Sequence, residues 1–486
     1  GDVYKRQMKI PYRLFLLSPI LAIASANADT LYYEGTGYWN VSSHWWSDSS
    51  GTPAGKAPTE DTDVVISGVT LSGTINTGGV NIKSLTFDGT QSFGNTQDIN
   101  FHDGFTIGGD FNYISSGNGN MMGIVGAGNS FNIEGKLTID ASNNKKAWLA
   151  FFKQMNTDSR IGTLTIKNGL EIIGGSGQAT AALTLNVKDT FVTGKVKLAN
   201  ANSVLNLTRS VKVEGTFTNN FTCDGIDGTG KITIGATSYG VGGAIPTVIQ
   251  NIIFNNSTNS SFKGISKGHY NDPVANISAD SELNIEMNAA SSNAVQTLRL
   301  EKGSYDTVAD NITVKNGMLS LYGDTSFKTL TLSGGYFSAA AANDPGDAPD
   351  IGTVSFESGM WSGGTIVIDI HADSAEADKI QFSGKFDKAE NADINLQFNF
   401  DPQGMAELVD TGISSFEDLI TYEEGSGIAG TVISGVSDNF AFEAVFGATG
   451  MDVSFSQVPE PAEFAFAFGA VALLFALRAR RQGLRR

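Results

Sequence analysis

The stretch TLTIKNGL, residues 163–170, decides the fold. Apolar and polar residues alternate over its first four positions, which is the period of a half-buried β-strand, and an Asn-Gly pair ends the run. Similar runs recur along the chain, each ended by Gly, Asn or Asp. The sequence therefore predicts many short strands joined by tight turns.

The spacing of these strands predicts how they are arranged. One apolar residue from each strand marks a repeat with steps of 18 to 32 residues, at Leu85, Phe105, Leu137, Leu164, Leu183, Leu205, Ile232, Ile252, Leu283, Ile312, Leu330 and Val354. Such steps are typical of β-helix rungs, in which each rung buries one apolar stripe against its neighbours and Asn and Gly form the corners. We predict an all-β fold, a right-handed parallel β-helix (β-solenoid) over residues 67–400.

Several antiparallel β-sandwiches are the competing fold. Asn-Gly pairs favour two-residue hairpins, and Asn168-Gly169 and Asn316-Gly317 both lie between apolar runs. The solenoid is favoured because the repeat extends over most of the chain.

The composition and charge exclude one class of partner. Charged residues make up only 17% of the 486 residues, and 57 are Gly. Between Asp29 and Gln457 there are 23 Lys and Arg but 47 Asp and Glu. Such an acidic chain repels phosphate, so we expect no nucleic-acid binding. Solubility is the simpler explanation of the charge, and recruitment of cations is the alternative.

Both ends of the solenoid are expected to be covered. Residues 29–66 contain Trp39, Trp45 and Trp46, followed by Ala57-Pro58-Thr59 and a short strand at residues 63–66. We predict an aromatic cap, since the first rung would otherwise expose its apolar end; a sugar-binding aromatic platform is the alternative. Residues 401–457 are predicted to be C-terminal capping strands.

These features resemble the passenger domains of autotransporter-like surface proteins. The aromatic opening is similar to the start of such passengers, and the segments at residues 365–370, 377–384 and 393–398 resemble their last rungs. The resemblance implies a β-solenoid at the cell surface. No amphipathic barrel strands follow, so self-translocation is not implied.

The N-terminal residues predict export. Residues 1–7 resemble the read-through of a transposase adapter used in sequencing libraries, so translation is expected to start at Met8. Residues 8–28 then form a signal peptide with a basic start, an apolar run at residues 14–23 and small residues at Ala26 and Ala28. We expect the Sec translocon to export the chain and signal peptidase to cut before Asp29.

The C-terminal residues 458–486 carry the most specific motif. Val458-Pro459-Glu460-Pro461 precedes an apolar run over residues 462–477, and a basic cluster follows at Arg478, Arg480, Arg481, Arg485 and Arg486. A helix of this run reaches only ~24 Å, short of the ~30 Å hydrocarbon core, so the arginines must snorkel. They hold the C-terminus in the cytoplasm by the positive-inside rule. A plain C-terminal membrane anchor is the alternative.

This order of motif, transmembrane helix and basic stop resembles the PEP-CTERM sorting tail. Pro459, Glu460 and Pro461 match the motif, and the arginine cluster matches the stop. The resemblance implies that an exosortase-type membrane enzyme removes the tail near the motif. It also implies a transient stay in the inner membrane of a Gram-negative-type bacterium, and then display at the cell surface or outside the cell.

Few residues suggest catalysis. Cys223 is the only cysteine, which excludes an internal disulfide and a Cys-based zinc site. Asp224 and Asp227 could form a carboxylate pair or a calcium loop, but the acidic closing ligand of an EF-hand is missing, and an Asp-Gly turn is the simpler interpretation. Arg209 is a candidate only because arginines are rare.

We therefore predict a structural or adhesive surface protein without catalytic residues or a cofactor, with exopolysaccharide as a candidate partner. A β-helix carbohydrate-active enzyme, either a polysaccharide lyase or a glycoside hydrolase, and a glycan-binding protein are the alternatives.

Overall fold

The structure is a computed structural model. It describes residues 29–33, 38–67, 75–88, 97–115, 121–126, 129–143, 145–152, 161–177, 179–207, 216–234, 247–267, 280–299, 309–322, 325–339, 351–371, 376–400, 415–437 and 440–457.

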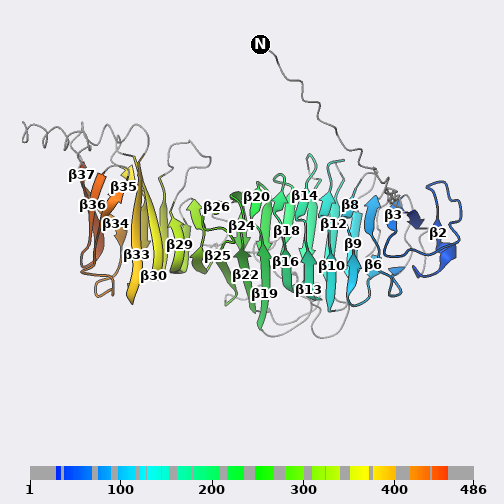
Figure 1. The fold of residues 1–486 in the computed structure, drawn as a ribbon, viewed down its shortest axis with the longest axis horizontal. Coiled ribbons are helices and arrows are strands. Elements are labelled where there is room, and N and C mark those ends of the chain that lie inside the picture. Colours follow the sequence, from blue (N-terminus) through cyan, green and yellow to red (C-terminus); the bar gives the residue numbers. More distant parts are fainter. Residues whose placement is uncertain are drawn as a thin grey trace, which may run out of the picture.

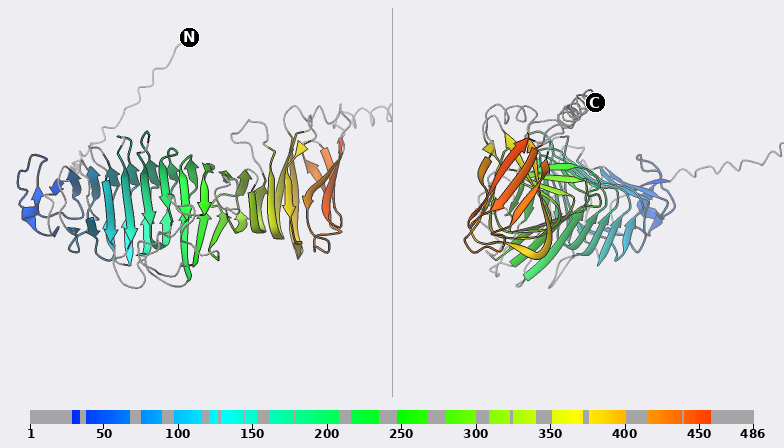
Figure 2. Two further views of the ribbon diagram at one scale, coloured as in Figure 1. Left: turned by 180° about the vertical axis from the view of Figure 1, so that it is seen from behind. Right: turned by 60° about the vertical axis from the view of Figure 1, so that its left-hand side comes forward.

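The protein is an elongated β-solenoid of about nine turns (Figure 1). Its strands lie side by side and follow one another along the long axis in the order of the sequence (Figures 1 and 2). Within the described ranges, all regular structure is β-strand except the short 3-10 helix η1 (Ser42–His44). The predicted all-β solenoid is confirmed.

Three parallel ladders of strands make up the solenoid wall. The first ladder contains, in order, β1 (Thr30–Tyr33), β3 (Asp63–Ser67), β5 (Ser84–Asp88), β8 (Phe111–Ile114), β11 (Leu137–Asp140), β14 (Leu170–Ile173), β17 (Val196–Leu198), β20 (Ile226–Gly228), β23 (Ser260–Lys263), β26 (Val295–Arg299) and β28 (Met318–Tyr322).

The second ladder contains β7 (Phe105–Ile107), β10 (Ser130–Ile133), β13 (Ile161–Ile166), β16 (Val187–Val192), β19 (Thr216–Cys223), β22 (Thr247–Phe254), β25 (Glu282–Asn288) and β27 (Asn311–Asn316). The third ladder contains β4 (Ile75–Asn76), β6 (Gln97–Asn100), β9 (Met121–Gly126), β12 (Ala147–Phe152), β15 (Ala181–Leu185), β18 (Ser203–Asn206), β21 (Lys231–Ile234) and β24 (Ile265–Lys267).

Towards the C-terminus the first two ladders continue in shared long strands, β29 (Thr325–Ser338), β30 (Thr353–His371) and β33 (Phe386–Phe400). The remaining strands of this end are β31 (Glu376–Ala377), β32 (Lys379–Phe382), β34 (Ser415–Thr421), β35 (Val432–Ser437), β36 (Phe440–Phe446) and β37 (Gly450–Gln457).

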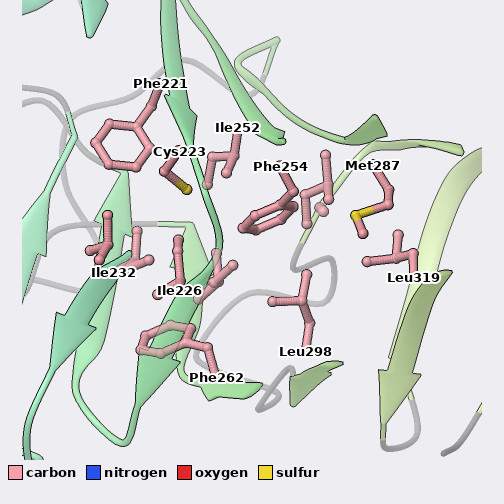
Figure 3. Packing of buried hydrophobic residues seen from close by; sticks show 14 of the residues in the cluster. Phe221, Cys223, Ile226, Ile232, Ile252, Phe254, Phe262, Met287, Leu298 and Leu319 are labelled. Atoms are coloured by element: carbon pink, nitrogen blue, oxygen red, sulfur yellow. The ribbon is translucent and has the colours of Figure 1, made fainter. Parts of the chain in front are cut away.

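The core is a continuous apolar column inside the ladders. In the second ladder, one inward position of each turn lies in register with the same position of the next, and the column reads Ile107, Ile133, Ile166, Val192, Cys223, Phe254, Met287, Val314, Leu332 and Trp361. All of these side chains are buried. Figure 3 shows how Cys223 and Phe254 face residues of the first and third ladders across the interior.

The repeat inferred from the sequence differs from the true turn. Leu85 belongs to the first ladder, Phe105 to the second and Leu183 to the third, so those steps compare different faces of the solenoid. In the second ladder, a turn takes 26 to 33 residues between Ile107 and Val314. The length of a turn could not be read from the strand spacing, because the strands of all three faces show the same alternation of apolar and polar residues.

The two Asn-Gly pairs form corners and not hairpins. Gly169 and Gly317 join a strand of the second ladder to the next strand of the first, with φ of 94° and 78°. Glycine adopts this left-handed conformation without the Cβ clash of other residues. The antiparallel sandwich is therefore not the fold of the body.

Aromatic side chains close the N-terminal end. Trp39 and Trp45 are fully buried, and Trp39 lies edge-on to Trp45, Phe101 and Phe105. The indole N–H of Trp45 donates to the carbonyl of Trp39 at 2.7 Å. The strand β2 (Trp45–Trp46) pairs antiparallel with β1. These two tryptophans fill the open end of the core. Because both are fully buried, neither can form an exposed platform for binding a sugar.

An antiparallel sheet covers the C-terminal end. Strand β34 pairs with β37, β37 with β36, and β36 with β35. Phe398 of the last long strand packs against Phe442 and Phe455 of this sheet, with ring centroids 4.9 and 5.1 Å apart. All four of these strands lie within residues 401–457, where the sequence predicts capping strands.

No helix in the described part of the chain is long and apolar enough to cross a membrane. The signal peptide expected at residues 8–28, which we predict to be helical, and the transmembrane helix expected within residues 458–486 lie outside the described residues.

Truncating one core side chain tests the column. We expect Phe254→Ala to lower the free energy of unfolding by about 3–5 kcal/mol, because it removes a buried ring and leaves a cavity. Phe191 lies two turns before Phe254 and is 44% exposed. Phe191→Ala is the matched control, and we expect its free energy of unfolding to stay within about 0.5 kcal/mol of the wild type. Urea denaturation measures both, and equal losses would contradict the proposed core.

Candidate functional site

The outer surface of the second ladder forms a regular polar face. We define this polar face by two rows of outward positions in register: Thr163, Asp189, Asn220, Asn251, Asn284, Asn311 and Thr329, and beside them Thr165, Phe191, Thr222, Ile253, Glu286, Thr313 and Thr331. These side chains are half-buried or exposed. Asparagine is the commonest residue of the first row and threonine of the second, and only Asp189 and Glu286 carry charge.

A chain of side-chain hydrogen bonds runs along the first row. Asn220 Nδ2 donates to Asp189 at 2.7 Å, and Asn251 Nδ2 donates to Asn220 Oδ1 at 2.7 Å. The next donors are Asn284 at 3.0 Å, Asn311 at 2.7 Å and the hydroxyl of Thr329 at 2.7 Å. Six turns are linked in one direction.

The direction of this chain follows from its two ends. A carboxylate only accepts hydrogen bonds, so Asp189 can end the chain but cannot continue it. A hydroxyl can supply the first donor, as Thr329 does. Each side-chain amide between them uses one N–H and one oxygen lone pair for the hydrogen bonds of the row. A side-chain amide has two of each, so a second N–H and a second lone pair can bind another partner. Bonds in such chains polarise and strengthen one another.

The outer surface of the first ladder carries more ion pairs than the polar face, where Glu286 pairs with Lys315 at 2.8 Å. Glu171 forms ion pairs with Lys136 of the preceding turn and Lys197 of the following turn, and Asp227 pairs with Lys195 at 3.0 Å. Burial opposes ionisation of Glu171, but the hydrogen bonds from Lys136 and Lys197 outweigh it and lower the pKa of its carboxyl. The polar face is therefore the less charged of the two surfaces.

Many of the aspartates have a structural use that the sequence did not reveal. The Asp103 carboxylate accepts backbone N–H groups of Asn129 and Ser130 in the next turn, at 2.7 and 2.9 Å. These bonds lower the pKa of the Asp103 carboxyl. Asp110 accepts the N–H of Lys136 in the same way, at 2.8 Å. Such aspartates join the corner of one turn to the next, which explains part of the acidic composition.

The sequence candidates for a carboxylate pair are used in this way too. Asp224 accepts the N–H of Ser257 and also its hydroxyl, at 2.8 Å, and Asp227 accepts the N–H of Ser261 at 2.9 Å. Among the described residues no group of three or more His, Cys, Asp or Glu side chains is arranged to hold a metal ion. Asp224 lies at the corner before β20, whereas Asp227 lies within β20, so the turn interpretation holds for Asp224 only.

The other candidates are placed as follows. Cys223 is buried in the core column, and burial raises the pKa of its thiol to about 12, so the nucleophilic thiolate does not form near neutral pH. Arg209, Ala26, Ala28, the sorting motif and the basic stop lie outside the described residues. Asp29 is described: its carbonyl accepts the N–H of Asp63 at 3.0 Å, and its carboxylate pairs with Lys56.

No protein-family model matches the chain, and no curated protein matches it in sequence. What the protein does must therefore be inferred from its own residues.

A charge placed inside the hydrogen-bonded row tests the polar face. Asn251→Asp can still accept from Asn284 but can no longer donate to Asn220, and we expect it to lower the free energy of unfolding by about 1–3 kcal/mol at pH 7. Protonation of the new carboxyl restores a donor that can reach Asn220 Oδ1. We therefore expect the deficit relative to the wild type to shrink when the pH is lowered far enough to protonate that carboxyl.

Thr222→Asp is the matched control, because it adds the same charge to the same face outside the row. Urea denaturation at several pH values measures both variants. A deficit that is equal in the two variants at every pH would contradict the continuous row.

Proposed function

We propose that the protein is a structural or adhesive protein of the surface or extracellular matrix of a Gram-negative-type bacterium, and that its polar face adheres to exopolysaccharide. We further propose that signal peptidase and the Sec translocon export it, and that an exosortase-type enzyme sorts it at its C-terminal tail.

The composition of the polar face is the observation that carries the adhesive function. Hydroxyl or amide groups recur there in every turn except that of Asp189 and Phe191, at the ~4.8 Å spacing of neighbouring strands. These groups can both donate and accept hydrogen bonds, which matches the hydroxyl groups of a sugar chain. Low charge on this face disfavours an ionic partner, and the long regular array suits an extended polymer. Nucleic acid is disfavoured by the acidic charge of the chain.

The terminal motifs support export and sorting. The first strand begins at Thr30, directly after the expected mature terminus, and Asp29 is held by Asp63 and Lys56. The last strand ends at Gln457, immediately before the Val458–Pro461 motif. Cleavage at both predicted sites would therefore leave every described strand intact.

Adding positive charge to the polar face tests adhesion. We expect the double variant Thr222→Lys and Thr313→Lys to bind immobilised neutral exopolysaccharide at least about tenfold more weakly than the wild type, because long charged side chains cover the hydroxyl rows. Asn112→Lys with Thr138→Lys adds the same charge to the first ladder and should bind normally. Surface plasmon resonance measures all three proteins. Equal binding by both double variants would overturn the assignment of the face.

Replacing the sorting motif tests the tail. We expect alanines at Pro459, Glu460 and Pro461 to keep the full-length chain in the inner membrane, since the processing enzyme loses its recognition site. Glu463→Ala is the control, because it changes one tail residue and leaves the motif intact. Intact-mass analysis of cell fractions should find a wild-type protein that begins at Asp29 and lacks residues 462–486. Normal trimming of the triple variant would show that another protease is responsible.

A further inference from the structure

One turn of the polar face has neither a hydroxyl nor an amide group in its two rows. Strand β16 lies between β13 and β19 and contributes Asp189 to the first row and Phe191 to the second (Figure 1). Phe191 is 44% exposed, whereas the other side chains of both rows are half-buried. The most exposed side chain of the polar face is therefore an aromatic ring.

A second apolar side chain lies in the same row. Ile253 follows Phe191 after two turns, at ~9.6 Å, and Thr222 lies between them in register with both. Single apolar side chains are common on protein surfaces. Here a phenyl ring, the methyl group of a threonine and an aliphatic side chain follow one another along the solenoid axis. The second row therefore offers an apolar strip over three turns.

The first row supplies hydrogen-bonding groups beside this strip. The Asp189 carboxylate accepts one hydrogen bond from Asn220 Nδ2 at 2.7 Å, and an ionised carboxylate has about four acceptor sites. Asp189 and Phe191 are successive outward residues of one strand, ~6.6 Å apart. A molecule that lies on the phenyl ring can therefore also donate a hydrogen bond to this carboxylate from its edge, and such charge-assisted bonds are the stronger ones.

The two strips define the chemistry of the molecule that fits them, which needs a flat face of C–H groups and an edge of hydroxyl donors. A pyranose ring with only equatorial hydroxyl groups has both, because its axial C–H bonds form two apolar faces and its hydroxyl groups surround the edge. The π face of an aromatic ring is negative and attracts such C–H groups. An axial hydroxyl would instead place a polar group on the face that meets Phe191, where its hydrogen bonds to water are lost.

We infer that the polar face binds a neutral, β-linked polysaccharide of hexopyranoses with equatorial hydroxyl groups. The C–H face of one sugar lies on Phe191, and the chain continues along the solenoid axis over Thr222 and Ile253. Hydroxyl groups at the edge of the sugars bond to Asp189 and Asn220. This inference rests on the proposed adhesive function and adds the class of sugar that the face selects.

Two oligosaccharides of equal length and linkage test the selectivity. Cellohexaose has only equatorial hydroxyl groups on its rings, whereas mannohexaose carries one axial hydroxyl on each sugar. Because successive sugars of such a β-linked chain are turned over, every face of mannohexaose presents an axial hydroxyl at every second sugar. We expect the full chain in mild detergent to bind cellohexaose at least about fivefold more tightly than mannohexaose, measured by isothermal titration calorimetry.

Replacing the ring tests the contact itself. We expect Phe191→Ala to weaken cellohexaose binding about tenfold, since the apolar contact is lost, and Phe191→Trp to bind at least as tightly as the wild type. Phe191→Ala is expected to leave the stability nearly unchanged, so a loss of affinity does not report unfolding. Tyr336→Ala is the matched control, because Tyr336 is 37% exposed but extends the first ladder, next to Met318.

The outcomes separate this inference from the adhesive function. Wild-type affinity in Phe191→Ala, an equal loss in Tyr336→Ala, or equal affinities for the two oligosaccharides would overturn the inference. The adhesive function survives each of these results if Thr222→Lys with Thr313→Lys still weakens binding to immobilised exopolysaccharide. A wild-type protein that binds neither oligosaccharide nor any neutral exopolysaccharide overturns both.

Discussion

A turn of this solenoid can hide its apolar side chains only against the turns before and after it. Parallel backbone pairing holds each inward residue in register with its neighbours, so Cys223 lies between Val192 and Phe254 in one column. No turn is a complete folding unit, because its core is shared. The requirement for register explains why so many polar side chains also act between turns and not within them.

The strands could be predicted from the sequence, but their assignment to faces could not. Alternation at Leu164 and Leu183 indicates a strand in both cases, although one lies in the second ladder and the other in the third. Pattern alone does not distinguish them, since each face buries the same kind of stripe. The corner glycines carry the missing information. Gly169 needs its positive φ to turn the chain between two faces, whereas the same dipeptide in an isolated sequence favours a hairpin.

The polar face was harder to foresee than the core. Asparagine was expected at corners, and Asn220, Asn251 and Asn284 instead lie within strands and bond along the ladder. The signal was present in the spacing, because these residues are separated by 31 and 33 residues, which is one turn. This spacing can be recognised as one turn only when the length of a turn is known. The acidic residues also act between turns. The Asp103 carboxylate accepts a backbone N–H of the next turn, so this aspartate stabilises a corner and is not explained by solubility alone.

The ends of a solenoid pose a problem that its repeats cannot solve, since the last turn has no neighbour. Here the two ends solve it differently. At the N-terminus, the side chains of Trp39 and Trp45 fill the opening, and Trp45 belongs to the short strand β2 that pairs with β1. At the C-terminus, a sheet crosses the opening, and Phe398 packs beneath it. The C-terminal cap therefore buries the core with the inward side chains of a sheet, such as Phe442 and Phe455, whereas the N-terminal cap buries it mainly with two indole rings.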